Sequence, residues 1–327
     1  MGIMNLNRFL IDNCKRTTIH KYALSSLKNK TIVIDTSIYL YKYIGQNALF
    51  ENFYTMISQF RENNINPLFI FDGKAPVEKY DLLDARRNEK LSAEQEYNTL
   101  RMKIESYDEH VSHEQQKKEL LELKLLKSRF LRVRYSDIIM VKKLMTAYGV
   151  MYHEAEGEAD QVCAAMVLSG KAWACMSDDM DMFVYGCPRV IRHFSITNQN
   201  VLLYKLENIL SDLKIDMTTF RQITVLSGTD YNITSNTSFV ETMKWYEEYI
   251  HCKENMNLDF YDWLYKNTKY IQNYESLLKI YHLFQLDDLN IHRLTPFNVT
   301  YHNYDKDELH RMMKDDGFVF AKSTTNP

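Results

Sequence analysis

Three short apolar segments of the chain each end in an acidic residue. The first is 31–35 (Thr-Ile-Val-Ile-Asp), the second is 67–72 (Pro-Leu-Phe-Ile-Phe-Asp), and the third is 171–178, which ends in Ser-Asp. Each has the length of a buried strand, and stretches with helical character, such as 50–61 and 160–169, lie between them. Strands that alternate with helices predict an α/β fold, in which a mostly parallel central sheet carries helices on both faces.

The acids at these strand ends occupy the positions where an open α/β sheet binds its ligands. The carboxyl ends of parallel strands meet at one edge of the sheet, where ligand sites form. Asp35, Asp72 and the run 178–181 hold this position, 154–160 adds acids just before a helix, and Asp230 follows another apolar stretch. Carboxylates that gather in one place repel one another unless a cation neutralises them. A hard divalent cation with oxygen ligands does so, and the pattern therefore favours a magnesium-type site.

Helix capping is an alternative interpretation of some of these acids. Glu156, Glu158 and Asp160 precede a helix, and acids are favoured in the first turn of a helix. Asp179 and Asp181 are two residues apart, a spacing that puts both side chains on one side only in an extended or loop conformation. We therefore expect these pairs in loops or first turns. The joint occurrence of acids at several strand ends favours the metal site over capping.

A helical insertion separates the second and third strands. Residues 78–148 contain neither Gly nor Pro and are rich in Glu, Lys, Leu, Gln and Arg, which favour helices. From 117 to 143 there are nine Lys or Arg and three Asp or Glu, a net charge of +6, whereas 241–316 has nine and fourteen, a net charge of −5. The net charge of −3 for the whole chain therefore conceals a basic segment and an acidic, mainly helical C-terminal region.

Several classes of protein are disfavoured by the sequence. The five cysteines are odd in number and form no Cys-x-x-Cys pair, which argues against a zinc ribbon or a disulfide framework. We see no basic-then-apolar leader and no apolar run of about 18 residues, so we expect no signal peptide and no membrane contact. Together these features predict an intracellular protein with reduced thiols.

Six blocks in order along the chain resemble the flap endonucleases, the structure-specific 5′ nucleases related to the XPG repair nuclease. Any one block is a weak signal, but their common order over 1–231 is specific. They are Met1-Gly-Ile-Met-Asn-Leu, Val33-Ile-Asp35, Phe69-Ile-Phe-Asp72-Gly-Lys, Glu158-Ala-Asp160, Ser177-Asp-Asp-Met-Asp181 and Ser227-Gly-Thr-Asp230-Tyr. The second acid of the fourth block is Asp160, where the family has the longer Glu, so we expect its metal contact to run through water.

The resemblance implies a PIN-like 5′ nuclease fold and a centre for two Mg²⁺ or Mn²⁺ ions. The implied metal ligands are seven carboxylates, namely Asp35, Asp72, Glu158, Asp160, Asp179, Asp181 and Asp230. Lys79 and Arg86 match the family's catalytic basic pair, and their spacing of seven residues places both on one face of a helix. The implied reaction is in-line attack of water on a phosphodiester.

The resemblance also implies a division of the chain and a path for nucleic acid. Residues 1–77 and 136–231 would form the nuclease core, 78–135 a helical arch, and 232–327 a divergent DNA-binding region. The basic arch would guide a single strand. The implied nucleic-acid contacts are Gly2, Tyr41, Lys124, Lys127, Arg129 and Arg132, although a solvated helix face or a core tyrosine is the alternative for most of them.

The sequence departs from the family after Asp230. The family has a Gly-Ile-Gly turn there that grips duplex DNA and a K⁺ ion, whereas 232–239 contains no glycine. Asn232, Thr234, Ser235 and Asn236 offer a substitute turn, but the sequence does not support duplex and K⁺ binding strongly. It has no clear motif for binding a sliding clamp.

Three functions follow as hypotheses. The first is a Mg²⁺-dependent endo- and exodeoxyribonuclease that acts as a monomer on DNA flaps, nicks and ends in replication, repair or recombination. The second is a 5′→3′ exonuclease on RNA or single-stranded DNA, and the third is a non-catalytic DNA-binding scaffold. The abundance of Asn, Lys, Ile and Tyr is typical of an AT-rich genome, such as that of a large DNA virus, which suggests action in a nucleus or at a viral replication site.

Overall fold

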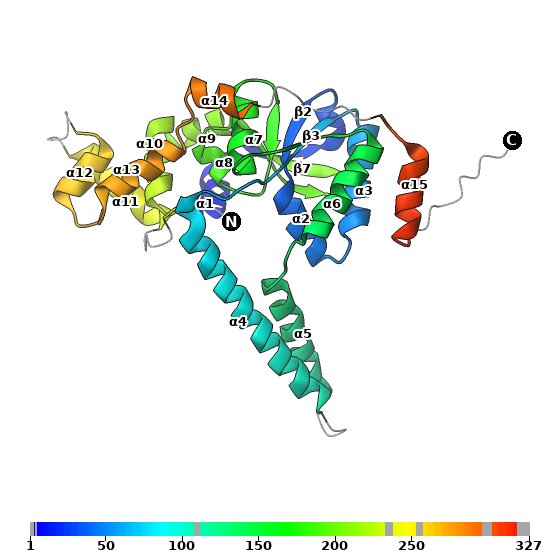
Figure 1. Cartoon of the computed structure of the whole chain (residues 1–327). Helices are drawn as coiled ribbons and strands as arrows, with labels where there is room; N and C mark the ends of the chain where they lie inside the picture. Colours follow the sequence, from blue (N-terminus) through cyan, green and yellow to red (C-terminus); the bar gives the residue numbers. More distant parts are fainter. Residues whose placement is uncertain are drawn as a thin grey trace.

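A seven-stranded sheet forms the centre of the computed structural model (Figure 1). The structure describes residues 3, 5–107, 112–232, 238–252, 258–295 and 303–318. The strand order is β1-β7-β6-β5-β2-β3-β4, in which the five strands from β6 to β4 are parallel and β7 pairs antiparallel with both β6 and β1. The strands are β1 (Ile19–Ala23), β2 (Thr31–Asp35), β3 (Asn66–Phe71), β4 (Met151–Glu154), β5 (Ala174–Met176), β6 (Arg189–Ser195) and β7 (Asn200–Lys205). The predicted mostly parallel sheet is confirmed.

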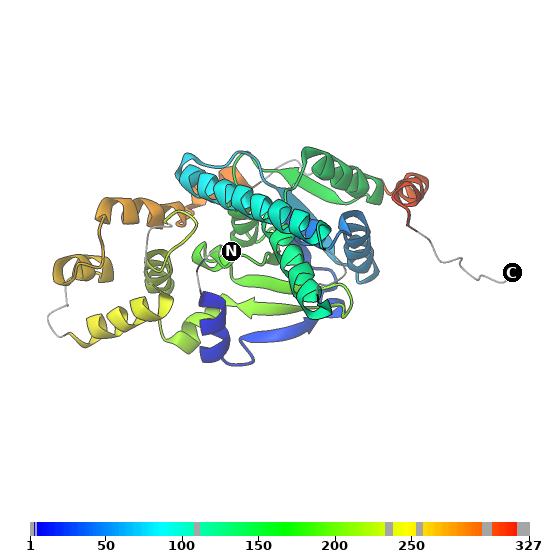
Figure 2. The same ribbon diagram turned by 90° about the horizontal axis from the view of Figure 1, so that it is seen from below.

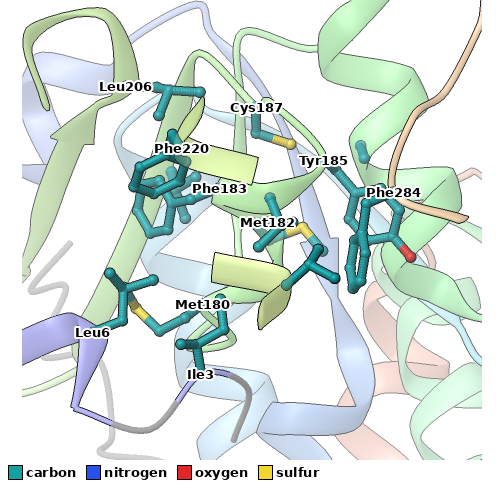
Figure 3. Close-up of a cluster of buried hydrophobic side chains, with 14 of the residues drawn as sticks. Ile3, Leu6, Met180, Met182, Phe183, Tyr185, Cys187, Leu206, Phe220 and Phe284 are labelled. Carbon is teal, nitrogen blue, oxygen red and sulfur yellow. The ribbon is translucent and has the colours of Figure 1, made fainter. Parts of the chain in front are cut away.

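Helices cover both faces of the sheet and enclose two hydrophobic cores. Successive side chains of a strand point to opposite faces, so Val33 of β2 joins one core while Ile32 and Ile34 join the other. Figure 3 shows part of the first core, where Phe183 packs near Phe220. Its helices are α1 (Leu6–Asn13), α7 (Ala159–Leu168), α8 (Asp181–Val184), α9 (Leu206–Leu213) and α10 (Met217–Leu226). The second core is covered by α2 (Thr36–Gly45), α3 (Leu49–Glu62), α6 (Tyr135–Tyr148) and α15 (Lys306–Asp315).

The order of the strands creates a switch point beside β2. From β2 the chain moves outward to β3 and β4, and then crosses back to β5 on the other side of β2. The helices between β2 and β3 cover one face, whereas α7, between β4 and β5, covers the other. Such a reversal opens a crevice outside the carboxyl ends of the two central strands. The predicted acids of β2 and β5 lie at this place.

Two long helices project from this body (Figure 1). They are α4 (Tyr80–Glu105), preceded by the short turn η2 (Val77–Lys79), and α5 (His113–Arg129). At about 1.5 Å per residue α4 is about 39 Å long. The pair is held together by few buried side chains, among them Ala93 and Leu126, and by the ring contact of Tyr97 with Phe130 at 5.3 Å. In Figure 2 the two helices lie over the middle of the molecule.

The C-terminal region is helical, as its lack of glycine predicts. The helices α11 (Phe239–His251), α12 (Phe260–Asn267) and α13 (Tyr274–Leu283) extend the first core beyond α10, and α14 (Asp288–Leu294) packs beside α7. The short helix η1 (Leu24–Leu27) links β1 to β2. Among the helices of the described residues, none has the length and apolar character needed to cross a membrane.

Candidate active site

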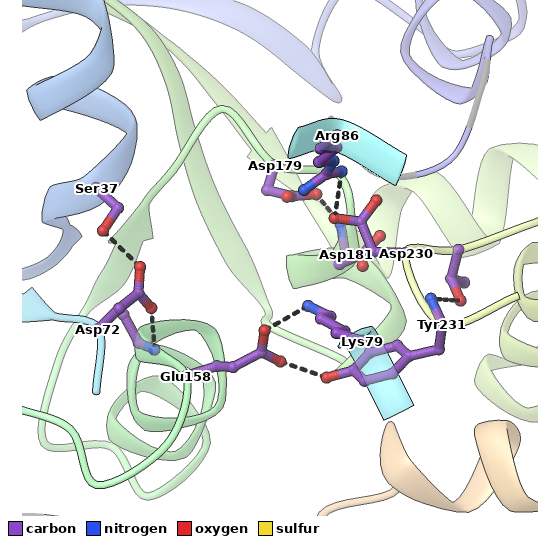
Figure 4. A network of polar contacts seen from close by, with 11 residues as sticks. Ser37, Asp72, Lys79, Arg86, Glu158, Asp179, Asp181, Asp230 and Tyr231 are labelled. Carbon is purple, nitrogen blue, oxygen red and sulfur yellow. Dashed lines mark hydrogen bonds and ion pairs between the residues drawn. The ribbon is translucent and has the colours of Figure 1, made fainter. Parts of the chain in front are cut away.

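Acidic side chains from five separate parts of the chain meet in one cavity at the carboxyl edge of the sheet, and Figure 4 shows several of them. The cavity has a volume of about 240 Å³. Tyr41, Lys79 and Arg86 line it together with six of the seven predicted carboxylates, namely Asp35, Asp72, Glu158, Asp160, Asp179 and Asp230. The seventh, Asp181, is 2% exposed and donates its backbone N–H to Asp179 Oδ1 at 3.0 Å. The structure therefore brings all seven acids and both predicted cations together.

The two central strands place Asp35 and Asp179. Asp35 is the last residue of β2 and Asp179 follows β5, which pairs in parallel with β2. The Ser177 hydroxyl donates to Asp35 Oδ2 at 3.1 Å and accepts from the Asp179 N–H at 3.1 Å. The Arg192 guanidinium donates to the carbonyl of Asp178 at 2.7 Å. The loop that carries Asp179 is therefore anchored on both sides.

The start of α7 places Glu158 and Asp160 beside Asp72. Glu158 is the N-cap residue of α7, yet its side chain makes no cap hydrogen bond. Asp72 instead accepts the N–H of Ala159 at 2.8 Å on one oxygen and the Ser37 hydroxyl at 2.5 Å on the other. Capping thus accounts for Asp72 in part, because its carboxylate caps a helix distant in sequence, whereas it does not account for Glu158.

Burial and mutual repulsion disfavour the charged forms of four of these acids. Burial is the largest cause in each case, and it raises the pKa of Asp35, Asp160, Asp179 and Asp181. For Asp35 the pKa rises to about 8, because the neighbouring carboxylates of Asp72 and Asp179 add to the effect of burial. A group of buried carboxylates that raise one another's pKa values is typical of a functional site rather than of a structural core.

The two cations pair with two of the acids. Lys79 Nζ lies 2.6 Å from Glu158 Oε1, and Arg86 Nη2 lies 2.9 Å from Asp230 Oδ2. Burial is the largest single effect and opposes the charge of Lys79, but Glu158, Asp160 and Asp230 together outweigh it, and the pKa of Lys79 is raised. Lys79 belongs to η2 and Arg86 to α4, so the base of the projecting helix is tied directly to the carboxylates.

The donor set fits hard divalent cations. Every acid offers only oxygen, and the buried Asp181 Oδ1 atom has no hydrogen-bond partner in the part of the chain that the structure describes. Within the described residues, however, no three acidic, histidine or cysteine side chains converge closely enough to hold an ion unaided. Mg²⁺ keeps several waters and takes one or two carboxylates together with substrate phosphate. The dispersed arrangement suits ions bound largely through water.

The predicted nucleic-acid contacts do not share one cavity, in contrast to the acids. Tyr41 is 41% exposed and stands between the acidic cavity and a larger hollow of about 760 Å³. That hollow is lined by cations without any acid, namely Arg86, Arg87, Lys90, Arg129 and Arg132. Lys127 lines a neighbouring hollow, and Lys124 is exposed on α5. Gly2 lies outside the described residues.

Two of these arginines have acidic neighbours on α4. Arg132 Nη2 lies 2.6 Å from Glu94 Oε2, and Arg129 Nη1 lies 3.8 Å from Glu96 Oε2. Because these pairs are exposed, they hold the side chains only weakly. Both guanidinium groups therefore remain available to a phosphate.

The predicted substitute turn after Asp230 is described only in part. Asn232 Oδ1 accepts the N–H of Thr229 at 2.6 Å, and Asn232 Nδ2 donates to the carbonyl of Val225 at 2.8 Å. Asn232 therefore closes the turn that precedes it, at 229–232. Thr234, Ser235 and Asn236 lie outside the described residues, so the weak support for duplex and K⁺ binding there is not tested.

Sequence reasoning missed the polar residues that support the acids. Ser37, Ser177 and Tyr231 each hydrogen-bond to a predicted ligand. Ser37 and Ser177 lie within two residues of a strand-end acid, and Tyr231 directly follows Asp230. Their closeness in sequence to predicted acids is the one feature that could have identified them. Their partners belong to distant segments, which no local pattern identifies.

Two family models match the chain, the XPG N-terminal domain over residues 1–93 and the XPG I-region over residues 149–230. Flap endonuclease 1 of Methanococcus aeolicus is 28% identical over 228 residues, which are 64% of this chain and 65% of the relative. A probable RAD2-like endonuclease of Invertebrate iridescent virus 3 is 25% identical over 286 residues, 71% of this chain and 74% of the relative. The chain spans 60–65% of the length of the first three flap endonucleases that it matches.

Among solved structures, the catalytic core of Rad2 in complex with DNA substrate has a similar fold. Its TM-score is 0.63 at 20% sequence identity, and the match covers 96% of this chain and 95% of that one. The two family models together cover more than half of the sequence and include all seven predicted carboxylates together with Gly2, Tyr41, Lys79 and Arg86. The chain therefore belongs to the XPG and flap endonuclease family.

Proposed function

We propose that this protein is a divalent-metal-dependent 5′ nuclease, with flap endonuclease and 5′→3′ exonuclease activity on DNA. The observation that carries the proposal is the convergence of seven carboxylates with Lys79 and Arg86 at the carboxyl edge of the sheet. Its substrates would be DNA flaps, nicks and ends in replication, repair or recombination. The viral relative supports action at a viral replication site or in a nucleus.

The cations of the cavity have a direct role in this reaction. A pair of bound Mg²⁺ or Mn²⁺ ions would activate water and stabilise the leaving oxygen, held by the seven carboxylates named above. Lys79 and Arg86 are ion-paired without substrate. Because a phosphate competes for the same donors, a scissile phosphate in the cavity would draw both cations from Glu158 and Asp230. Their charge would then stabilise the charge that develops on the phosphate oxygens.

The basic hollow beside the cavity gives the nucleic acid its approach. Its five cations would bind phosphates in any sequence, since phosphate contacts carry no sequence information. The exposed ring of Tyr41, at the border between the hollow and the cavity, offers a surface on which a base can stack. A strand that enters between α4 and α5 would thus reach the carboxylates.

A 5′→3′ exonuclease on RNA or single-stranded DNA is the second candidate. It is favoured by the segment 232–239, which lacks the glycines with which the family grips duplex. A non-catalytic scaffold is disfavoured, because such a protein has no need of buried carboxylates that repel one another.

One experiment tests the proposal and separates these candidates. The protein is incubated with end-labelled 5′-flap DNA, nicked duplex, single-stranded DNA and RNA, in Mg²⁺, Mn²⁺ or EDTA. We expect cleavage of the flap DNA that requires metal and is abolished in Asp181→Ala and Asp35→Ala. Asp12→Ala, at an exposed surface position, is the matched control and should cleave normally. Cleavage that survives EDTA or both site substitutions would refute the assignment, and preference for RNA would favour the second candidate.

A further inference from the structure

We propose that Tyr231 is a positioning residue that holds both Glu158 and Lys79 for the reaction, an inference that rests on the function proposed above. Tyr231 follows Asp230 and lies opposite the start of α7 (Figure 4). It is neither one of the seven carboxylates nor one of the two cations, and its side chain reaches one member of each set.

The three side chains form a closed arrangement. The Tyr231 hydroxyl donates to Glu158 Oε2 at 2.5 Å, while Lys79 Nζ binds the other oxygen, Oε1, at 2.6 Å. Lys79 Nζ also lies 4.4 Å from the centre of the Tyr231 ring, within the range of a cation–π contact. The hydroxyl of Tyr231 therefore orients the Glu158 carboxylate, and its ring contacts the Lys79 ammonium group.

Tyr231 is itself held rigidly. Its ring meets the fully buried ring of Phe284 edge-on at 5.4 Å and 87°, and Phe284 packs on Tyr185 at 4.8 Å. Figure 3 shows Tyr185 and Phe284 side by side in the first core. The backbone N–H of Tyr231 donates to Thr229 Oγ1 at 3.2 Å, within the turn closed by Asn232. A core aromatic cluster and a hydrogen-bonded turn thus determine where the tyrosine points.

This arrangement matters most when Lys79 leaves Glu158 for a phosphate. Glu158 then keeps the Tyr231 hydroxyl as a partner, and the carboxylate stays aimed into the cavity. The ring remains a favourable surface for Lys79 close to the phosphate position. Partners that orient a metal-binding side chain contribute about 10–100-fold in affinity or activity, so the hydroxyl is expected to affect metal binding and the ring to affect the rate.

The first test measures Mn²⁺ binding to the intact protein without DNA, by electron paramagnetic resonance of the free ion. We expect Tyr231→Phe, which removes only the hydroxyl, to weaken Mn²⁺ binding about tenfold. The matched control is Tyr261→Phe, because the Tyr261 hydroxyl is also buried and hydrogen-bonded, to the carbonyl of Gln222 at 2.8 Å. The control should bind Mn²⁺ like the wild type. Equal Mn²⁺ affinity of Tyr231→Phe and wild type would overturn the role of the hydroxyl.

The second test separates the ring from the hydroxyl. At saturating Mn²⁺, Tyr231→Leu should cleave flap DNA in a single turnover about tenfold more slowly than Tyr231→Phe, with unchanged DNA affinity. Equal rates of the two variants would overturn the role of the ring. Failure of the wild type to bind Mn²⁺ or to cleave would instead refute the proposed function, so the two failures are distinguishable. Circular dichroism confirms that each variant is folded before it is compared.

Discussion

The buried carboxylates of the cavity are individually unfavourable in the metal-free protein. Asp35, Asp179 and Asp181 are each less than 10% exposed, and Asp181 Oδ1 has no hydrogen-bond partner among the described residues. Burying a charged group costs free energy unless a partner neutralises it. Ser177 and the neighbouring backbone supply only neutral donors to these acids. In the function proposed above, a bound cation would offset this cost in stability.

The raised pKa of Asp35 predicts how stability depends on pH in EDTA. The folded pKa of about 8 lies above the ordinary value of 3.8, so the folded state binds more protons than the unfolded state between these values. The unfolding free energy of the wild type should therefore fall, relative to that of Asp35→Asn, as the pH rises from about 4 to about 8. Urea denaturation at several pH values measures this difference. A difference that rises or stays flat with pH would contradict the prediction.

At the scale of the elements, the loops after β3 and β4 bring Asp72 and Glu158 to the same cavity. Gly73 N–H donates to the carbonyl of Gly157 at 2.7 Å, and Lys74 N–H donates to that of Glu156 at 3.0 Å. These bonds join the two loops directly beyond the last paired residues of the strands, Phe71 and Glu154. A Cβ atom on Gly73 would lie 2.0 Å from the carbonyl oxygen of Ala155, so only glycine fits there.

Gly73→Ala should therefore lower the melting temperature and the cleavage rate together. The two backbones would have to separate by more than 1 Å, which breaks both hydrogen bonds and displaces Asp72. Destabilisation of about 2–3 kcal/mol is expected from the strain and the lost bonds. Gly157→Ala is the matched control, because its Cβ would meet no atom closer than 3.9 Å. Equal melting temperatures of Gly73→Ala and Gly157→Ala would show that the close approach of Gly73 to the Ala155 carbonyl does not constrain the loops.

The projecting helices should control the affinity for nucleic acid. Substituting Gln for Lys124, Lys127, Arg129 and Arg132 should weaken DNA binding and flatten its salt dependence, by about 0.7 in slope for each lost single-strand phosphate contact. Fluorescence anisotropy at several salt concentrations measures the slope. Lys21 and Lys28, exposed at the far edge of the sheet, serve as the control positions. An unchanged slope in the arch variant would mean that the basic helices do not contact phosphate.

At the scale of the whole molecule, the last helix returns to the opposite side of the sheet. After α14, which packs beside α7 at the first core, α15 packs against α6 at the second. Leu309 and Met313 of α15 are buried there, and the Arg61 guanidinium stacks on the Tyr304 ring at 3.9 Å. The helix α15 therefore covers part of the second core.

Met313→Ala should destabilise the protein without altering the site. Truncation of a fully buried methionine costs about 2–5 kcal/mol, whereas Arg311→Ala, at an exposed position of the same helix, should change the unfolding free energy by less than about 0.5 kcal/mol. Chemical denaturation measures both. The cleavage rate of each folded variant should match that of the wild type. A selective loss of cleavage in Met313→Ala would show instead that α15 communicates with the cavity.

The sequence by itself determined the parallel sheet, the acids at its strand ends and the two helical regions of this protein. Apolar runs that end in acids predicted β2, β3 and β5, and the parallel pairing of these strands places Asp35, Asp72 and Asp179 at one edge. The helical insertion and the helical C-terminal region followed from composition, because long stretches without Gly or Pro favour helices. These properties are local or periodic along the chain, and they can be recognised before any folding is known.

Tertiary structure alone decided which groups meet across the cavity. The pairing of Lys79 with Glu158, the capping of α7 by Asp72 and the support of Glu158 by Tyr231 each join segments that lie at least 70 residues apart. The edge strand β1 likewise pairs antiparallel with β7 across about 180 residues. Such contacts depend on distances and directions in space, and no spacing along the sequence encodes them. The physical reason is that side-chain hydrogen bonds and ion pairs act over only a few ångströms, so the complete fold must first bring their partners together.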